Sequence, residues 1–193
     1  SSDYSKVLPI VIHGDAAVAG QGIGQEVIQM SQLKGYRNFG TIHFVINNQI
    51  GFTTDWDDAR SSDYCTAIAN MMNCPVFHVN GDNVEDVIFA CEAAAEYRSK
   101  FKKDVFIDMV CYRKHGHNES DDPKYTQPEM YNLISKKKNP RDIYAEYLSS
   151  QGSVEADIVK KLDKELYDDL QDRLNKVKEE TKNYVYRPHE KAW

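Results

Sequence analysis

The sequence has few cysteines and no apolar run long enough to cross a membrane. Its 193 residues include four cysteines and no Cys-x-x-Cys pair, so a metal site built on paired thiolates is not indicated. A membrane-spanning helix needs about 20 consecutive apolar residues, and no stretch approaches that length or resembles a signal peptide. We therefore expect no membrane partner and a reducing compartment, with free, buried thiols at Cys65, Cys74, Cys91 and Cys111.

The sequence also lacks the positive charge that a nucleic-acid-binding surface needs. The formal net charge is −6, and the densest basic run is three lysines at residues 136–138. Three lysines on a helix are usually a solvated face, so nucleic acid is not an expected partner. With 41% apolar residues, the chain can bury the core of one domain.

Four β-rich apolar runs recur along the chain, with helical segments between them. They cover residues 8–13, 41–46, 75–79 and 104–112. The first run has the pattern of a strand buried on both faces. Asn83 is expected to cap the helix after the third run, because its side-chain oxygen can accept from free N–H groups of the first turn. This alternation predicts an α/β domain, a parallel β-sheet with helices on both faces.

Two long polar loops, residues 47–62 and 113–128, follow the second and fourth runs. The first loop is rich in Asn, Asp, Thr and Gly, so we expect no packed structure there and a short helix starting near Asp63. Ligands of parallel sheets bind beyond the carboxyl ends of the strands, which is where both loops begin. Long ordered loops in such places are commonly functional.

The chain changes character after Pro128. Between Ser153 and Lys182, 16 of 30 residues are charged, and apolar residues recur at every fourth position from Val154 to Leu174. This pattern predicts one long charged helix with a narrow apolar stripe. We therefore divide the chain into an α/β domain, residues 1–150, and a helical C-terminal extension, residues 151–193. The stripe is expected to pack on the sheet domain or on a neighbouring part of a longer protein, with a partner-binding helix as the alternative.

Oxygen-bearing side chains lie where the first two strands end. Asp15 follows the first strand in the run HGDAA, and Asn48 follows the second in NNQIG. Mg²⁺ prefers oxygen ligands in near-octahedral geometry and often shares them with phosphates. Asp15 can offer such an ion a carboxylate, Asn48 an amide oxygen and Ile50 a backbone carbonyl. Asn47 points the opposite way from Asn48 in an extended chain and is expected to serve the loop. The alternative to a metal ligand at Asp15 is a side chain that only caps a turn.

The glycines at positions 20 and 22 do not form a dinucleotide-binding fingerprint. That motif needs a third glycine where the chain has Gln25, and it should follow the strand directly. We therefore do not expect NAD. The glycines are better suited to a close approach to a cofactor, with the next helix directing its amino terminus at phosphates.

A second cluster lies at residues 113–119, RKHGHNE. A glycine between two histidines in a polar loop suits a site where a side chain meets an anion or transfers a proton. The alternative is a solvated loop whose histidines titrate freely. Three other histidines lie within predicted strands and are expected to be satisfied core or edge residues: His13, His43 and His78.

Four segments, in order, resemble the thiamine-dependent first component of the 2-oxoglutarate dehydrogenase complex. They are residues 13–22 (HGDAAVAGQG), 47–54 (NNQIGFTT), 59–62 (ARSS) and 111–119 (CYRKHGHNE). The resemblance runs from about Leu8 to Gly152. It implies a thiamine-diphosphate-binding fold and oxidative decarboxylation of 2-oxoglutarate, with succinyl transfer to lipoamide in the tricarboxylic acid cycle. A 2-oxoadipate dehydrogenase, another 2-oxo acid dehydrogenase and a non-catalytic assembly domain are the alternatives.

The resemblance also implies the site residues and partners. Thiamine diphosphate and Mg²⁺ are the implied cofactors, with Mg²⁺ bound by Asp15, Asn48 and the carbonyl of Ile50. The cofactor diphosphate would be lined by Gly14, Ala16 and Gln21. His117 matches a histidine that faces the active site, and it is the catalytic candidate. The implied partners are a 2-oxo acid, the dihydrolipoyl succinyltransferase core through its lipoyl domain, and a second copy in a homodimer.

In this family a glutamate of a second domain activates the cofactor, and that domain is absent from the sequence. We therefore expect the chain to be the diphosphate-binding part of a longer polypeptide and to be inactive by itself. The expected location is the bacterial cytoplasm or the mitochondrial matrix.

Overall fold

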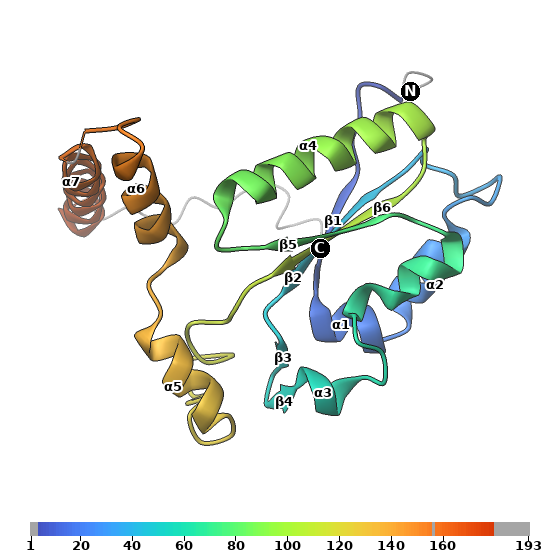
Figure 1. The fold of residues 1–193 in the computed structure, drawn as a ribbon, viewed down its shortest axis with the longest axis horizontal. Helices are drawn as coiled ribbons and strands as arrows, with labels where there is room; N and C mark the ends of the chain where they lie inside the picture. The colour runs from blue at the N-terminus through green and yellow to red at the C-terminus, as the bar shows by residue number, and fades with distance from the viewer. Residues whose placement is uncertain (1–3, 156, 180–193) are drawn as a thin grey trace. The chain divides into compact units, whose positions relative to one another are not determined.

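A four-stranded parallel sheet forms the centre of the chain in the computed structural model, which describes residues 4–155 and 157–179 (Figure 1). Its strands are β1 (Ile10–Gly14), β2 (Ile42–Asn47), β5 (Val76–Asn80) and β6 (Val105–Val110). Their order across the sheet is β1-β2-β6-β5, and every neighbouring pair is parallel. The four predicted strands are confirmed to within two residues at each end.

Helices cover both faces of this sheet. On one face lie α1 (Asp15–Gly20), α2 (Ile23–Met30) and the 3-10 helix η1 (Cys65–Met72), and on the other lies α4 (Val84–Phe101) (Figure 1). Side chains alternate between the faces along β6: Phe106 packs with the first group of helices and Ile107 with α4. Each such fully buried side chain contributes roughly 1.5–3 kcal/mol. The predicted α/β fold, with helices on both faces, is confirmed.

Strand β1 differs from its predicted environment. It was expected to be buried on both faces, but it forms one edge of the sheet, and Ile10 and Ile12 are 55% and 67% exposed. The prediction of burial on both faces is wrong because an apolar run indicates only that a strand can be buried, not where it lies in the sheet. The order of strands across a sheet depends on contacts between distant parts of the chain.

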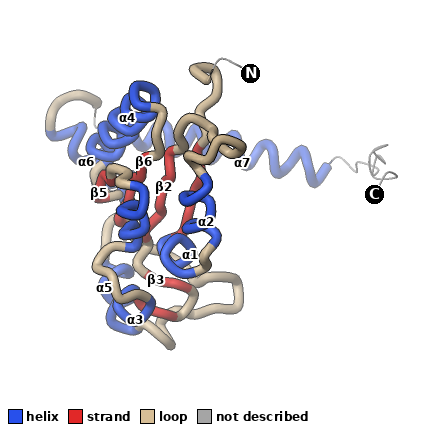
Figure 2. Tube along the Cα trace, turned by 90° about the vertical axis from the view of Figure 1, so that its right-hand side faces the viewer, coloured by secondary structure: helices blue, strands red, loops and turns tan. Residues whose placement is uncertain are grey.

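The first polar loop is more structured than predicted. It contains a two-stranded antiparallel ribbon, β3 (Ile50–Gly51) with β4 (Thr54–Asp55), followed by α3 (Trp56–Ala59). The tight turn between β3 and β4 places Phe52 in the left-handed region, with φ of 53°. The expectation of no packed structure is therefore wrong. Turn-forming residues here build a compact segment, β3, β4 and α3, which we call the excursion. Figures 1 and 2 both show the excursion beyond one end of the sheet, where α5 (Pro128–Lys136) also lies.

The helix start at Asn83 is confirmed, because the backbone N–H of Asp86 donates to Asn83 Oδ1 at 3.3 Å. The short helix expected near Asp63 is η1, which begins at Cys65.

The chain divides into two compact units, Ser1–Tyr144 and Ala145–Trp193, and α6 (Pro140–Ser150) spans the division. In the second unit, α7 (Ile158–Glu179) is the predicted charged helix. It starts later than predicted, since Ser153 and Val154 lie in a bend, and the predicted end at Lys182 falls outside the described residues. The apolar stripe of α7 is exposed, and the packing expected for it stays a prediction. Within the described ranges, no helix is long and apolar enough to cross a membrane.

Candidate functional site

The two oxygen-bearing motifs lie side by side at the carboxyl edge of the sheet. Strands β1 and β2 are parallel neighbours, with Gly14 in register with Ile46, so Asp15 and Asn48 both lie just beyond this edge. The motifs also touch, since a Cβ added to Gly51 would lie only 2.6 Å from the Ala16 Cβ. A glycine at position 51 therefore allows the second motif to seat directly on the first.

Asp15 is the first residue of α1, and its side chain is buried. Burial raises the pKa of its carboxyl group. The backbone N–H groups of Asp15, Ala16 and Asn48 and the guanidinium of Arg60 act in the opposite direction. Arg60 is the nearby cation, with Nη1 3.9 Å from Asp15 Oδ2. The carboxylate is thus buried among backbone N–H groups and a guanidinium, which already supply positive potential.

Asn48 lies beyond the same edge of the sheet as Asp15, and its backbone N–H acts on the Asp15 carboxyl group. Asn48 Oδ1 accepts a hydrogen bond from the Ile50 N–H at 3.3 Å, and an amide oxygen has a second lone pair for a further partner. One carboxylate, one amide oxygen and one backbone carbonyl form a donor set suited to a hard cation such as Mg²⁺. Within residues 4–155 and 157–179, no three His, Cys, Asp or Glu residues form a metal cluster, and the proposed set includes only one such residue.

The other predicted diphosphate-lining residues occupy different places. Gly14 faces open space, since nothing lies within 4 Å of a Cβ built there, and Ala16 lies against Gly51. Gln21 is exposed and follows the last residue of α1. A six-residue helix is about 9 Å long, so the structure separates Gln21 from Asp15 by that length.

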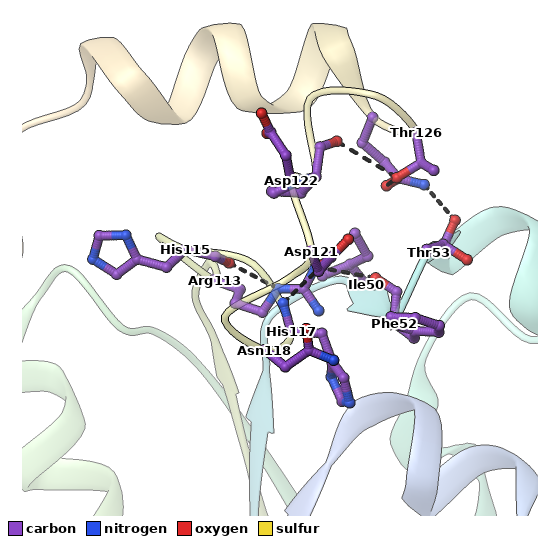
Figure 3. A network of polar contacts seen from close by, with 12 residues as sticks. Ile50, Phe52, Thr53, Arg113, His115, His117, Asn118, Asp121, Asp122 and Thr126 are labelled. Carbon is purple, nitrogen blue, oxygen red and sulfur yellow. Dashed lines mark hydrogen bonds and ion pairs between the residues drawn. The ribbon is translucent and has the colours of Figure 1, made fainter.

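His117 lies over the β3–β4 turn, in the loop that follows β6. Its ring is 4.9 Å from the ring of Phe52, and its backbone N–H donates to Asp121 Oδ2 at 2.8 Å. Arg113 ties the two loops together by donating to the Phe52 carbonyl at 3.0 Å and pairing with Asp121 at 3.7 Å. Figure 3 shows the ring of His115 directed away from this cluster and that of His117 beside Phe52. Of these two histidines, His117 is therefore the one that lies against the β3–β4 turn.

The glycine between these histidines has a structural reason. A Cβ at Gly116 would lie 2.0 Å from the carbonyl oxygen of Asp121, so the loop can fold back on itself only with glycine at this position.

Sequence reasoning missed a buried carboxylate next to the site. Asp108 lies in the middle of β6, fully buried, and accepts from Asn47 Nδ2 at 3.0 Å and from His78 Nδ1 at 3.0 Å. The side chain of Asn47 is thus buried against β6, and the expectation that it serves the loop is wrong. A charged residue inside an otherwise apolar strand was the available signal, because buried carboxylates occur only with partners.

The strand histidines are satisfied, as predicted. His43 is buried, lies 3.3 Å from Asp104 Oδ2 and 3.0 Å from the ring nitrogen of His13, and stacks on Phe106. His78 is held by Asp108 at the far edge strand.

The family described as "Dehydrogenase E1 component" matches residues 3–185. The chain is 56% identical over 152 residues to the 2-oxoglutarate dehydrogenase E1 component of Haemophilus influenzae, covering 78% of the chain and 16% of that protein. It is 46% identical over 183 residues to the multifunctional 2-oxoglutarate metabolism enzyme of Mycolicibacterium vanbaalenii, covering 95% of the chain and 15% of that protein.

A mitochondrial protein is also similar. The 2-oxoglutarate dehydrogenase of Dictyostelium discoideum is 53% identical over 150 residues, covering 78% of the chain and 15% of that protein. The chain thus spans about a sixth of the length of the curated relatives it matches.

Proposed function

Because the chain belongs to the dehydrogenase E1 component family, we propose that it supplies the magnesium and diphosphate half of a thiamine diphosphate site. The reaction proposed for the whole protein is oxidative decarboxylation of 2-oxoglutarate, as the names of its relatives suggest. The observation that carries the proposal is the contact between Ala16 and Gly51, which joins the Gly-Asp and Asn-Asn motifs at the ligand edge of the sheet.

In this proposal, Asp15, Asn48 and the carbonyl of Ile50 hold Mg²⁺. The diphosphate lies over Gly14 and Ala16, with Gln21 at the far end of α1. When bound, thiamine diphosphate supplies the carbon centre that accepts electrons during decarboxylation. The chain itself binds and orients the diphosphate and places charge where it is needed.

His117 is the residue proposed to act on the substrate. Its ring is exposed, lies against Phe52, and stands on a loop braced by Arg113. An imidazole so placed can hold a substrate carboxylate or transfer a proton at the reacting oxygen. His115 faces elsewhere and receives no role.

The proposal extends to the partners of the whole protein. The acyl group would pass to the lipoyl domain of a dihydrolipoyl succinyltransferase core, and the protein would act as a homodimer. The compartment would be the bacterial cytoplasm or the mitochondrial matrix, in keeping with the bacterial and mitochondrial relatives. A 2-oxoadipate substrate is the second candidate, because the described site includes no group assigned to the distal carboxylate.

Calorimetric titration tests the site directly. Thiamine diphosphate, and separately inorganic diphosphate, are titrated into the chain with and without Mg²⁺. We expect binding that requires Mg²⁺ and that is lost in Asp15→Asn. Asp58→Asn is the matched control, because Asp58 is an exposed carboxylate of α3 in the same excursion. Absence of Mg²⁺-dependent binding by the folded wild-type chain would refute the proposal.

A further inference from the structure

Arg60 is a buried cation to which neither the sequence nor the comparisons give a role. It follows α3, and its side chain is only 9% exposed. Its guanidinium lies 5.3 Å above the ring of Trp56, and Nη2 donates to the Asp63 carbonyl at 3.3 Å. Nε is buried and has no hydrogen-bond partner in the part of the chain that the structure describes.

This guanidinium is poorly satisfied for so buried a group. Charge-assisted hydrogen bonds between arginine and an oxyanion are commonly about 2.7–2.9 Å long, whereas Arg60 Nη1 is 3.9 Å from Asp15 Oδ2. Arginine carries five N–H donors in a planar fork. A buried charge without close partners is costly, so Arg60 is positioned to accept an anion with more oxygen atoms than Asp15 alone provides.

The surroundings of Arg60 leave space for such a change of partner. A hollow of about 180 Å³ is lined by Arg60, Trp56, Tyr64 and Asn47, among others. The Asn47 Oδ1 atom is also buried without a partner among the described residues. Arg60 therefore has room to shift without displacing the packed core beneath it.

We propose that Arg60 pairs with Asp15 when no metal is bound and binds oxygen atoms of the diphosphate when the magnesium complex is bound. The inference rests on the proposed function. Mg²⁺ and the guanidinium compete for one carboxylate, so by themselves they oppose each other. The diphosphate removes that conflict because its oxygen atoms bind both cations at once. Arg60 thus favours the joint binding of metal and diphosphate over binding of the metal alone.

This arrangement predicts effects of opposite sign for one substitution. In Arg60→Met, Mg²⁺ alone should bind about two- to three-fold tighter, because the guanidinium that competes for the Asp15 carboxylate is gone and that ion pair is weak. Inorganic diphosphate at saturating Mg²⁺ should bind at least about ten-fold more weakly, because charge-assisted hydrogen bonds are lost. A residue that only supports the fold would move both affinities in the same direction.

The test is a pair of calorimetric titrations on wild-type chain and variants, with MgCl₂ alone and with inorganic diphosphate at saturating Mg²⁺. Arg37→Met is the matched control, since Arg37 also lies over an aromatic ring, Phe39 at 4.8 Å, but in the segment before β2. Neither affinity should change in this control.

The outcomes separate the two proposals. If the wild-type chain binds neither ligand, the proposed cofactor site fails. If the wild-type chain binds both, but Arg60→Met weakens both or changes neither, only the role of Arg60 is overturned. Arg60→Lys keeps the test decisive if Arg60→Met does not fold. It retains the charge, so Mg²⁺ alone should bind as in wild type, while loss of the planar fork should still weaken diphosphate binding. Unchanged diphosphate binding in Arg60→Lys would overturn the inference.

Discussion

Substituting Gly51 with alanine tests whether contact between the two motifs shapes the site. The added Cβ would lie 2.6 Å from the Ala16 Cβ, whereas nonbonded carbon atoms are comfortable at about 3.5–4.0 Å. The turn that carries Ile50 must therefore move away from α1 by about 1 Å. Overpacking of this kind costs roughly 1–3 kcal/mol, which corresponds to a fall in Tm of about 2–12 °C for a chain of this size.

The same displacement should weaken ligand binding. Constellations of binding groups must be held to within about 0.5 Å, and a shift of about 1 Å can cost as much as 100-fold. We expect the Kd for inorganic diphosphate at saturating Mg²⁺ to rise by about 10- to 100-fold in Gly51→Ala. Calorimetric titration gives the Kd, and a thermal melt followed by circular dichroism gives the Tm.

A second substitution isolates the cause. Ala16→Gly removes the opposing Cβ, so Ala16→Gly/Gly51→Ala should recover most of the affinity, although a glycine within α1 costs roughly 0.5–1 kcal/mol. Gly35→Ala is the control, because nothing lies within 4 Å of its added Cβ. Wild-type affinity and Tm in Gly51→Ala would refute the reasoning, and so would a double variant as impaired as the single one.

Replacing His117 with alanine in the full-length enzyme should lower kcat/KM by at least about ten-fold and leave Tm unchanged, because the side chain is exposed. His115→Ala should do much less, and equal small effects would support a freely solvated loop. Asn83→Ala should lower the free energy of unfolding by about 1 kcal/mol, since the cap of α4 is lost; coincident urea denaturation curves would contradict this. Burial raises the pKa of Cys65 to about 12 and that of Cys111 to about 11, from 9.0. The unfolded chain therefore loses these thiol protons at lower pH than the folded chain, and the free energy of unfolding should fall as pH rises above 9.0. Urea denaturation at several pH values should show a smaller fall in Cys65→Ser, and an equal fall in the two proteins would count against this prediction.

The sequence by itself determined the class of fold and the position of the candidate metal site. Both depend on patterns that are local along the chain. Buried parallel strands read as short apolar runs, and Asn83 caps its helix through a neighbour three residues away. Because parallel strands end at the same edge of a sheet, Asp15 and Asn48 could be expected together before strand order was known. The roles predicted for them, and for His117, stay predictions.

Only the tertiary structure decided which side chains surround that site. Arg60 pairs with Asp15, which lies 45 residues earlier in the chain. Asp108 of β6 contacts Asn47 of β2 and His78 of β5. The exposed edge position of β1 is likewise set by strand order, and the excursion at residues 47–62 is seated on α1 through Gly51. These are contacts between distant segments, which no local periodicity records. They depend on how the loops close and on which buried polar groups find partners, and these are properties of the folded chain as a whole.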